Sequence, residues 1–539
     1  MELSQIESRH WRMAVALALL TIALGAWQMV PGVTGIYHDD GIYVCTAKAL
    51  AQGQGYRLIN LPGSPIQTKY PIIYPALLAV VWKIWPVFPD NLVLMQWLTL
   101  LSGAAAVGLS YLYLIRFGYF SAGIACAAGL LTATSPPYLY FSVITMSEST
   151  FLLLLVLSMW LLEGELRESR ESPLREIILG ISLTLPFLCR SVGVIFIPIG
   201  LFLLYRAGRR LRYVIPSAAL TFIPWILWAA IVPRWESNLA TIYYTNYLKW
   251  WSDLGINALG RISLLNSFYI LVGVGTLDQA LLCELLRKIS FYGWIVVIPL
   301  GFMAFFGIGK QLRHFRVLSC FLVGYFFVVV VWPWPPGRFI MPVLPFLLAY
   351  FLHELWQSIP ERSFIVWKRI LLAVLGVFLM ANLTFAFFSA DVCRSTYYPY
   401  PWHLKKPVQW SSYLKMFKWI NTHTETSDVI ASGFDSMIYL YTGRSAFRPY
   451  MVHPVSLFYG EDSPPLGELK DFYRIMRWYK PRYLVQTAMP GFREEEPLNG
   501  LIEQVRAKDP QWLKPVYTGD DSRFIIYELQ PAHEPVPLD

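Results

Sequence analysis

Long runs of apolar residues, separated by short polar loops, dominate the first 390 residues of the chain. An α-helix rises 1.5 Å per residue, so about 20 apolar residues cross the roughly 30 Å hydrocarbon core of a bilayer. The runs predict spans near residues 11–30, 92–115, 121–138, 146–163, 213–232, 290–309, 317–332, 339–357 and 365–388. The pattern therefore predicts a polytopic α-helical membrane protein.

A further apolar stretch, residues 177–205, is interrupted by Arg190 and Ser191 and has basic loops on both sides. Basic loops favour the cytoplasmic side, and a single crossing would put one of these two outside. We therefore expect a hairpin of two short helices, which gives about eleven spans, and counts of about 10 to 13 also fit the pattern. The apolar segment 262–287 contains Asp278 and Glu284, so we expect a helix that lies at the outer interface.

Composition agrees with a membrane protein. Of the 539 residues, 56% are hydrophobic and 15% are charged, whereas soluble domains contain about 25% charged residues. The net charge of +9 does not indicate a nucleic-acid partner, because the Lys and Arg residues lie in short loops between apolar runs, as topology signals do. Their placement predicts a cytoplasmic N-terminus and an outer C-terminus.

The chain changes character after the last predicted span. Residues 405–539 are richer in charge and proline, and they contain short segments typical of strands and helices. We expect strands at 428–432, 482–486 and 523–529 and helices at 436–444 and 469–480. The sequence thus predicts a transmembrane domain, residues 1–390, and an extracytoplasmic α/β domain, residues 405–539.

The long outer loop between the first two spans, residues 31–91, carries candidate chemistry. It contains an adjacent acidic pair, Asp39 and Asp40, and Lys69 before a proline-started helix. Glu148 is expected at the outer end of its span, where a buried acid is a functional candidate. Ordinary solvated loop charges, or pairing of Glu148 with a helix dipole, would also explain these positions.

Two arginines are expected on the same side. Arg190 interrupts the short hairpin, and Arg338 opens a span after the proline-rich stretch "WPWPPG". Either could extend its head group to the interface. Two guanidinium groups that face the same compartment as the acids indicate instead a bound anion, because guanidinium matches phosphate geometry.

The order of these motifs resembles a known family. "DDGIYVCTAKALAQGQGYRLINLPGSPIQTKYPIIYP" is similar to the first outer loop of the GT-C glycosyltransferases, in particular the protein O-mannosyltransferases and lipid A aminoarabinose transferases. "VITMSEST", "GISLTLPFLCRSVGVIFIPIG" and "GRFIMPVLPFLLAYF" resemble later spans, and "VIASGFDSMIYLYTGRSAFRP" resembles the outer domain of bacterial members. The chain departs from the family in having "KYP" for Lys-Pro-Pro and "DD" for Asp-Glu.

The resemblance implies the GT-C fold and an inverting sugar transfer from a polyprenyl-phosphate donor within the membrane to an acceptor hydroxyl or phosphate at the outer face. Asp39 matches the general base. Asp40 would raise the pKa of Asp39 or cap the following helix. Glu148 would orient the acceptor or join Asp39 on a divalent metal such as Mg or Mn. Lys69 and Arg338, with Arg190, would hold the lipid phosphate.

Two other functions fit the same features. A transporter or flippase of lipid-linked sugars would place ionisable residues near the bilayer midplane and show internal repeats, whereas the candidates here are expected at outer ends of spans. A non-catalytic lipid-binding member of the fold would bind the donor without turnover. The acceptor (protein, lipid or glycan) is left open, and a bacterial inner membrane is favoured because the one N-x-S/T sequon, residues 382–384, falls inside a span.

Overall fold

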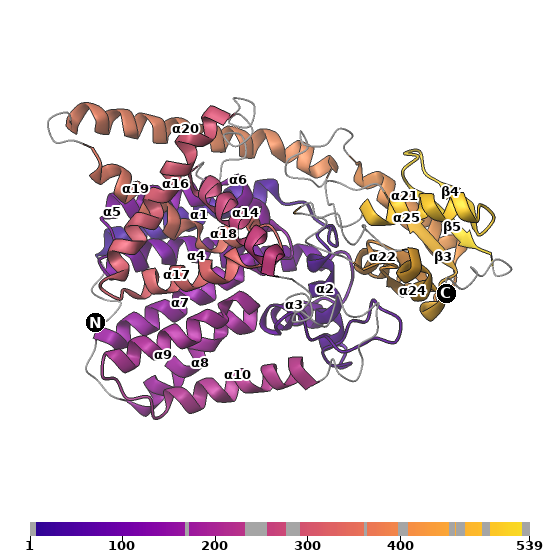
Figure 1. Cartoon of the computed structure of the whole chain (residues 1–539), viewed down its shortest axis with the longest axis horizontal. Coiled ribbons are helices and arrows are strands. Elements are labelled where there is room, and N and C mark those ends of the chain that lie inside the picture. The colour runs from indigo at the N-terminus through magenta and orange to yellow at the C-terminus, as the bar shows by residue number, and fades with distance from the viewer. Residues whose placement is uncertain are drawn as a thin grey trace. The chain divides into compact units, whose positions relative to one another are not determined.

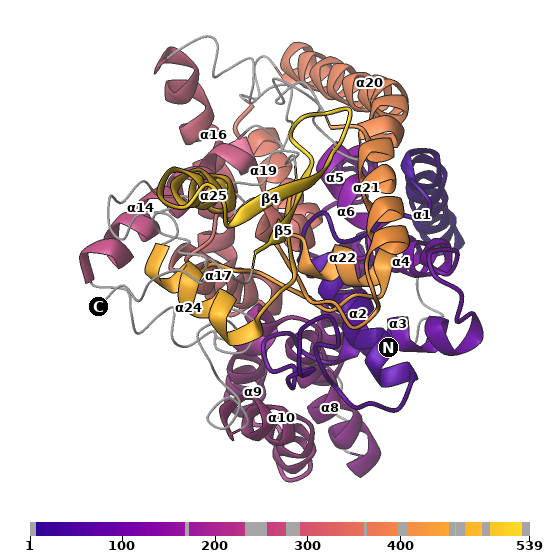
Figure 2. The same cartoon turned by 90° about the vertical axis from the view of Figure 1, so that its right-hand side faces the viewer.

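The computed structural model describes residues 7–167, 172–231, 256–275, 291–359, 364–396, 408–451, 459, 469–487 and 496–530. The chain forms two compact units. Unit 1 comprises Met1–Met29, Gln96–Ile226 and Leu259–Ala390, and unit 2 comprises Val30–Met95, Leu227–Ala258 and Asp391–Asp539. Figures 1 and 2 show the elements that build each unit.

Unit 1 is built from helices. Those lying wholly or mainly in it are α1 (Ser8–Gln28), α4 (Leu92–Arg116), α5 (Ala122–Thr134), α6 (Pro136–Val143), α7 (Glu148–Arg167), α8 (Pro173–Cys189), η2 (Ser191–Ile195), α9 (Phe196–Arg206), α10 (Val214–Ile231), α14 (Ile256–Gly275), α16 (Phe291–Leu312), α17 (Val317–Val330), α18 (Gly337–Ile340), η3 (Met341–Val343), α19 (Leu344–Gln357) and α20 (Phe364–Thr396).

Seven described helices are long and apolar enough to cross a membrane: α1, α4, α7, α10, α14, the segment Gly337–Gln357 and most of α20. Shorter apolar helices, among them α5, α17 and the segment Ser191–Arg206, accompany them. The multi-pass helical architecture predicted from the apolar runs is confirmed.

The predicted hairpin over residues 177–205 is present. Helix α8 ends at Cys189, and Arg190 has extended backbone angles before η2 and α9 continue the chain. The two arms fold back on each other, since a Cβ at Gly193 would overlap the backbone of Pro186, and one at Gly200 would overlap Leu183. Helices α8, α9 and α10 lie side by side in both views (Figures 1 and 2).

Two predicted segments differ in detail. The single span expected at 121–138 is two helices, α5 and α6, because Ser135 is extended and Pro136 and Pro137 follow it; a residue before proline disfavours the helical conformation. Helix α14 begins before the expected interfacial segment 262–287 and ends at Gly275. At 20 residues it is long enough to cross a bilayer, and Asp278 and Glu284 lie outside the described residues.

Unit 2 combines the loop after α1 with the C-terminal elements. Its helices and strands are α2 (Asp39–Ala51), α3 (Ile73–Ile84), α21 (Trp410–His423), β1 (Ile430–Ser432), α22 (Asp435–Thr442), β2 (Ala446–Phe447), α24 (Leu469–Tyr479), β3 (Tyr483–Gln486), α25 (Glu496–Lys508), β4 (Leu513–Thr518) and β5 (Ile525–Leu529). The strands and helices predicted in this region are confirmed, and α22 ends where predicted, because Gly443 adopts a left-handed conformation with φ 74°.

The strands form one mixed sheet of order β2-β1-β3-β5-β4. Strand β1 is parallel to β2 and β3, with Ile430 opposite Ala446 and Tyr483. Strand β5 is antiparallel to β3 and β4. In Figure 2, α21 lies on one side of β4 and β5, and α24 and α25 lie on the other.

The loop after α1 and the α/β elements share one hydrophobic core. Val33 and Ile36 are buried in the same cluster as Trp410, Met437 and Ile526. This packing fixes the chain just before α2, where the acidic pair begins, and so determines where the two carboxylates point.

Candidate functional site

The two adjacent aspartates at the start of α2 have different environments. Asp40 is buried, and its carboxylate accepts backbone hydrogen bonds from Gly35 (2.7 Å) and Tyr37 (2.9 Å). Both donors precede the helix, so Asp40 holds the loop that leads into α2. The pKa of Asp40 is raised to about 6, mainly by burial and to a smaller degree by the charge of Asp39, while backbone donors, Gly35 foremost, oppose the rise.

Asp39 is the more accessible of the two. It is the first residue of α2 and is half-buried. The hydroxyl of Tyr70 donates a short hydrogen bond to Asp39 Oδ1, which holds the carboxylate in one orientation. A carboxylate that is both oriented and partly accessible is suited to accept a proton from a bound molecule.

Lys69 adjoins the same tyrosine. Its ammonium lies 5.0 Å from the centre of the Tyr70 ring, and its side chain is buried. The local backbone is held by Gln67, whose Oε1 accepts from Lys69 N at 2.7 Å, and by Tyr56, whose hydroxyl donates to Tyr70 O at 2.8 Å. The structure thus brings Asp39, Asp40 and Lys69 into one neighbourhood of unit 2.

Helix α22 supports the acidic pair from the C-terminal part of unit 2. His38 Nε2 lies 3.0 Å from Asp435 Oδ1, and Asn60 donates to Asp435 Oδ2 at 2.6 Å. All three side chains are buried. A Cβ at Gly41 would collide with Ser436 Oγ, so α2 and α22 approach closely at this point.

Sequence reasoning assigned no role to His38, Asn60 or Asp435. His38 and Asp435 are 397 positions apart, and no local pattern in the chain links two such residues. The positive φ of His38, 61°, distinguishes this position in the folded chain, but nothing in the sequence indicates it.

The second group of predicted residues meets in unit 1. Glu148 is the first residue of α7, and its Oε1 lies 2.8 Å from Arg190 Nη1 and 2.9 Å from Arg338 Nη2. Arg338 Nε also donates to Glu148 Oε1, at 3.0 Å. Three residues separated by long stretches of sequence therefore form one charged cluster.

The cluster is mostly buried but reaches the surface through one arginine. The side chain of Glu148 is 2% exposed, that of Arg190 is 9% exposed and that of Arg338 is 29% exposed. Arg190 also donates to Ser147 Oγ at 3.0 Å. Two guanidinium groups against one carboxylate leave a net positive charge, which favours an additional anion.

Glu148 retains one oxygen for other partners, because its Oε2 has no hydrogen-bond partner among the described residues. The two arginines disfavour a divalent cation at this carboxylate, because like charges repel strongly at short range. Within the described part of the chain, no group of three or more His, Cys, Asp or Glu residues is arranged to hold a metal ion. The charges around Glu148 therefore fit an anion better than a metal.

Comparison with known proteins gives matches at the level of structure. The sequence matches no family model and no curated protein. The structure is similar to that of ArnT from Cupriavidus metallidurans bound to undecaprenyl phosphate, with a TM-score of 0.54, 12% identity, and coverage of 98% of this chain and 100% of that chain.

The structure is also similar to oligosaccharyltransferase structures from Archaeoglobus fulgidus. One, a complex with Zn and sulfate, has a TM-score of 0.54 and 15% identity and covers 88% of this chain and 67% of that chain. Another, AglB with an inhibitory peptide and a dolichol-phosphate, has a TM-score of 0.52 and 14% identity and covers 99% of this chain and 75% of that chain. The chain therefore has the fold of the GT-C glycosyltransferases, as the sequence resemblance predicted.

Proposed function

We propose that the chain is an inverting glycosyltransferase that moves a sugar from a polyprenyl-phosphate donor to an acceptor hydroxyl or phosphate at the extracytoplasmic face of the membrane. The observation that carries the proposal is the state of Asp39, a half-buried carboxylate oriented by Tyr70. The fold supports it, since structures that share this fold contain undecaprenyl phosphate or a dolichol-phosphate.

Asp39 is assigned as the general base. An acceptor hydroxyl attacks the anomeric carbon, the bond from that carbon to the phosphate oxygen breaks, and the hydroxyl proton passes to Asp39. Such base catalysis contributes about 10² to 10⁴ in rate. The leaving lipid phosphate is a stable anion, so this transfer needs no general acid of the kind that glycoside hydrolases use.

The basic residues are assigned to the lipid phosphate. Arg338 is the most accessible member of the Glu148 cluster, and its guanidinium can hold two phosphate oxygens at once. Arg190 is more buried and pairs with Glu148, which suits it to a supporting role. Lys69 is assigned to phosphate binding on its match to the family motif alone.

Asp40 and Glu148 are assigned as positioning residues. Asp40 fixes the loop that precedes Asp39 through its bonds to Gly35 and Tyr37. Glu148 orients the two arginines through Oε1. Its Oε2 is buried and has no hydrogen-bond partner among the described residues, and we assign Glu148 to orienting the acceptor. A metal bound jointly by Asp39 and Glu148 is disfavoured by the arginines around Glu148, and no step is assigned to one.

The proposed topology follows from the Lys and Arg placement: the N-terminus lies inside, and Asp39, Glu148 and the C-terminal α/β elements lie outside, in a bacterial inner membrane. Cysteine labelling at sites introduced at Asp520, which is 79% exposed, and at exposed Arg212 tests it. Reagent added from outside should label position 520 and spare position 212, and the reverse pattern would overturn the orientation.

The activity is tested with purified full-length protein in nanodiscs and a polyprenyl-phosphate sugar. A transferase releases free polyprenyl phosphate together with a glycosylated acceptor. A flippase moves the intact donor between leaflets of a liposome, and a non-catalytic member binds it without turnover. Mass spectrometry of envelope glycans, lipids and glycoproteins, with and without the functional chain, identifies the acceptor; unchanged glycosylation combined with no donor consumption would reject the proposal.

A further inference from the structure

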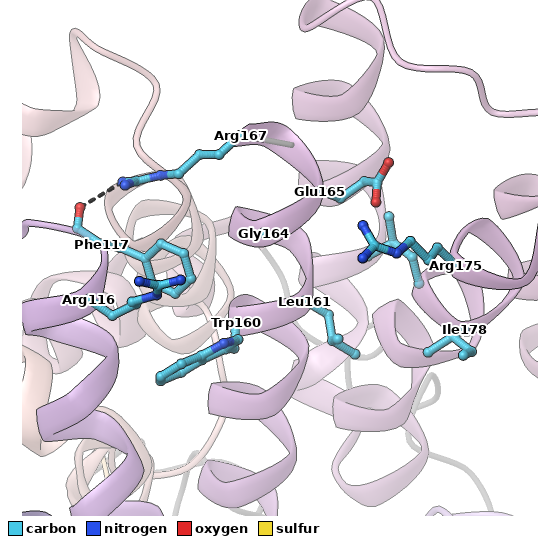
Figure 3. A pocket seen from close by; sticks show the side chains of 10 residues that line it. Arg116, Phe117, Trp160, Leu161, Gly164, Glu165, Arg167, Arg175 and Ile178 are labelled. Carbon is cyan, nitrogen blue, oxygen red and sulfur yellow. Dashed lines mark hydrogen bonds between the residues drawn. The ribbon is translucent and has the colours of Figure 1, made fainter. Parts of the chain in front are cut away.

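A cavity of about 260 Å³ lies at the end of α7 that is remote from Glu148. It is formed where the last turns of α4 and α7 meet the start of α8, and its lining includes Arg116, Arg167 and Arg175. Figure 3 shows these side chains around the opening. None of them takes part in the proposed transfer.

The cavity and the Glu148 cluster belong to opposite ends of one membrane-spanning helix. Glu148 begins α7, and Gly164, close to its end, lines the cavity. At 1.5 Å per residue, these two positions are separated by roughly 24 Å along the helix axis. A ligand of this cavity would therefore occupy the bilayer face opposite to Glu148.

The lining is positively charged. The lining contains three arginines and one carboxylate, Glu165; in Figure 3, Arg175 points toward Glu165 and Arg167 points toward Phe117. Arg167 is held in place, since its Nη2 donates to the carbonyl of Phe117 at 2.7 Å and its guanidinium lies 5.0 Å from the centre of the Phe117 ring. Arg167 Nε also lies 3.7 Å from Glu163 Oε2. Three guanidinium groups with one carboxylate in the lining still leave an excess of positive charge, which favours a phosphate ligand.

The rim of the cavity is apolar and exposed. Leu161 is 42% exposed and Ile178 is 46% exposed, and both line the cavity. On membrane-spanning helices, such side chains face lipid tails. A site that joins arginines to a lipid-facing apolar rim accommodates a head group and the start of its acyl chains, whereas free inorganic phosphate would use only the arginines.

We propose that this cavity binds the phosphate head group of an anionic phospholipid, with Arg116, Arg167 and Arg175 contacting the phosphate and Leu161 and Ile178 contacting the acyl chains. Basic pockets between transmembrane helices bind anionic lipid head groups in this way. The proposal is independent of the proposed glycosyl transfer, because it uses a different end of the bundle and different residues.

The sharpest test fills the cavity without removing a charge. A Cβ at Gly164 would meet no atom within 4 Å, so Gly164→Leu enters open space, and leucine favours helix over glycine. Gly309→Leu is the matched control, because Gly309 lies in α16 and its Cβ would also meet no atom within 4 Å. Native mass spectrometry of the full chain in detergent measures binding of dioctanoyl phosphatidylglycerol.

We expect Gly164→Leu to weaken phosphatidylglycerol binding at least about tenfold and Gly309→Leu to change it less than about twofold. The double variant Arg116→Gln/Arg175→Gln should also lose about tenfold or more, while exposed Arg313→Gln should not. Normal elution and melting of each variant establish that it is folded.

Comparison ligands separate the sources of phosphate. Dioctanoyl phosphatidylcholine and inorganic phosphate should each bind at least about tenfold more weakly than phosphatidylglycerol. If inorganic phosphate bound as tightly as phosphatidylglycerol, the cavity would be a phosphate site rather than a lipid site. If phosphatidylcholine bound as tightly as phosphatidylglycerol, the arginines would not select an anionic head group. Full phosphatidylglycerol affinity in Gly164→Leu would overturn the proposal outright, as would a loss confined to Arg338→Gln.

Discussion

The hydroxyl of Tyr70 donates a hydrogen bond to the carboxylate of Asp39, so the residue assigned as base is oriented by the residue that follows Lys69. The chain thereby links its acidic pair to its lysine through one aromatic side chain. The hydroxyl belongs to the residue at which the chain departs from the family motif, and a proline in place of Tyr70 could not supply it.

Tyr70→Phe should lower kcat about tenfold with KM for the donor changed less than about twofold, because the ring remains and only a hydrogen bond to a charged group is lost. Steady-state kinetics of the purified variant measure kcat and KM separately. Tyr205→Phe, at a tyrosine that is 75% exposed on α9, is the control and should match the wild type. An unchanged kcat in Tyr70→Phe would remove the orienting role.

Asp40 should make stability depend on pH in a defined direction. Burial raises the pKa of Asp40 to about 6 from its ordinary value of 3.8, so the folded protein binds this proton more tightly than the unfolded chain does. The stability that the protein gains from protonated Asp40 is fully present below about pH 3.8 and is lost as the pH rises through about 6.

Asp40→Asn cannot ionise and should therefore gain stability relative to the wild type between about pH 4 and pH 6, by up to roughly 3 kcal/mol. Melting temperatures of both proteins, measured across this pH range, show whether Asp40→Asn becomes more stable than the wild type as the pH rises. A constant difference, or one that moves the other way with pH, would show that Asp40 is charged throughout or that other groups dominate.

The Glu148 cluster makes a prediction about donor affinity. Arg338→Ala should weaken binding of polyprenyl phosphate by about ten- to a hundredfold, since it removes a charge-assisted contact. Arg338→Lys should recover part of the lost affinity, because lysine restores the positive charge but not the planar guanidinium that contacts two phosphate oxygens. Affinity for the lipid phosphate is measured directly, with exposed Arg313→Ala as control, and near-wild-type affinity in both Arg338 variants would assign Arg338 to the membrane interface instead.

Asp435, on α22, should stabilise the segment of residues 34–40, which contains the acidic pair. It is fully buried and accepts from Asn60 at 2.6 Å while His38 Nε2 lies 3.0 Å away, so Asp435→Asn should cost about 1 to 3 kcal/mol. Hydrogen exchange of residues 34–40 should become faster. Asp520→Asn, at a side chain 79% exposed and paired with Lys415, should cost less than about 0.5 kcal/mol; equal effects of the two changes would refute a specific role for Asp435.

The parts of the fold that depend on local sequence could be predicted. Apolar length determined the spans, the charge of Arg190 marked the break between α8 and η2, and Gly443 marked the end of α22. Strands β2 and β4 were not predicted: β2 has only two residues, and β4 carries an irregularity between Pro515 and Tyr517 and does not alternate between buried and exposed positions. Neither gives the period-two pattern by which strands are recognised.

The candidate residues could be named from sequence, but their partners could not. Glu148, Arg190 and Arg338 were singled out one by one for their charge at the ends of apolar segments, and only the folded chain shows that one carboxylate pairs with both arginines. The same holds for Asp40, whose acceptor role depends on the loop conformation at Gly35, with φ 92°. Such contacts follow from tertiary packing, which single-sequence patterns do not encode.

The most direct test of base catalysis is the turnover of a polyprenyl-phosphate sugar by Asp39→Asn, with donor binding recorded in parallel. The amide keeps the size of the carboxylate and can still accept from Tyr70, but it cannot take up a proton, so we expect turnover to fall at least about a hundredfold while donor affinity stays within about threefold. Asp40→Asn should retain more activity than Asp39→Asn at the same pH. Turnover by Asp39→Asn above about a tenth of the wild-type rate, or a dead Asp40→Asn beside an active Asp39→Asn, would contradict the assignment of Asp39 as the base.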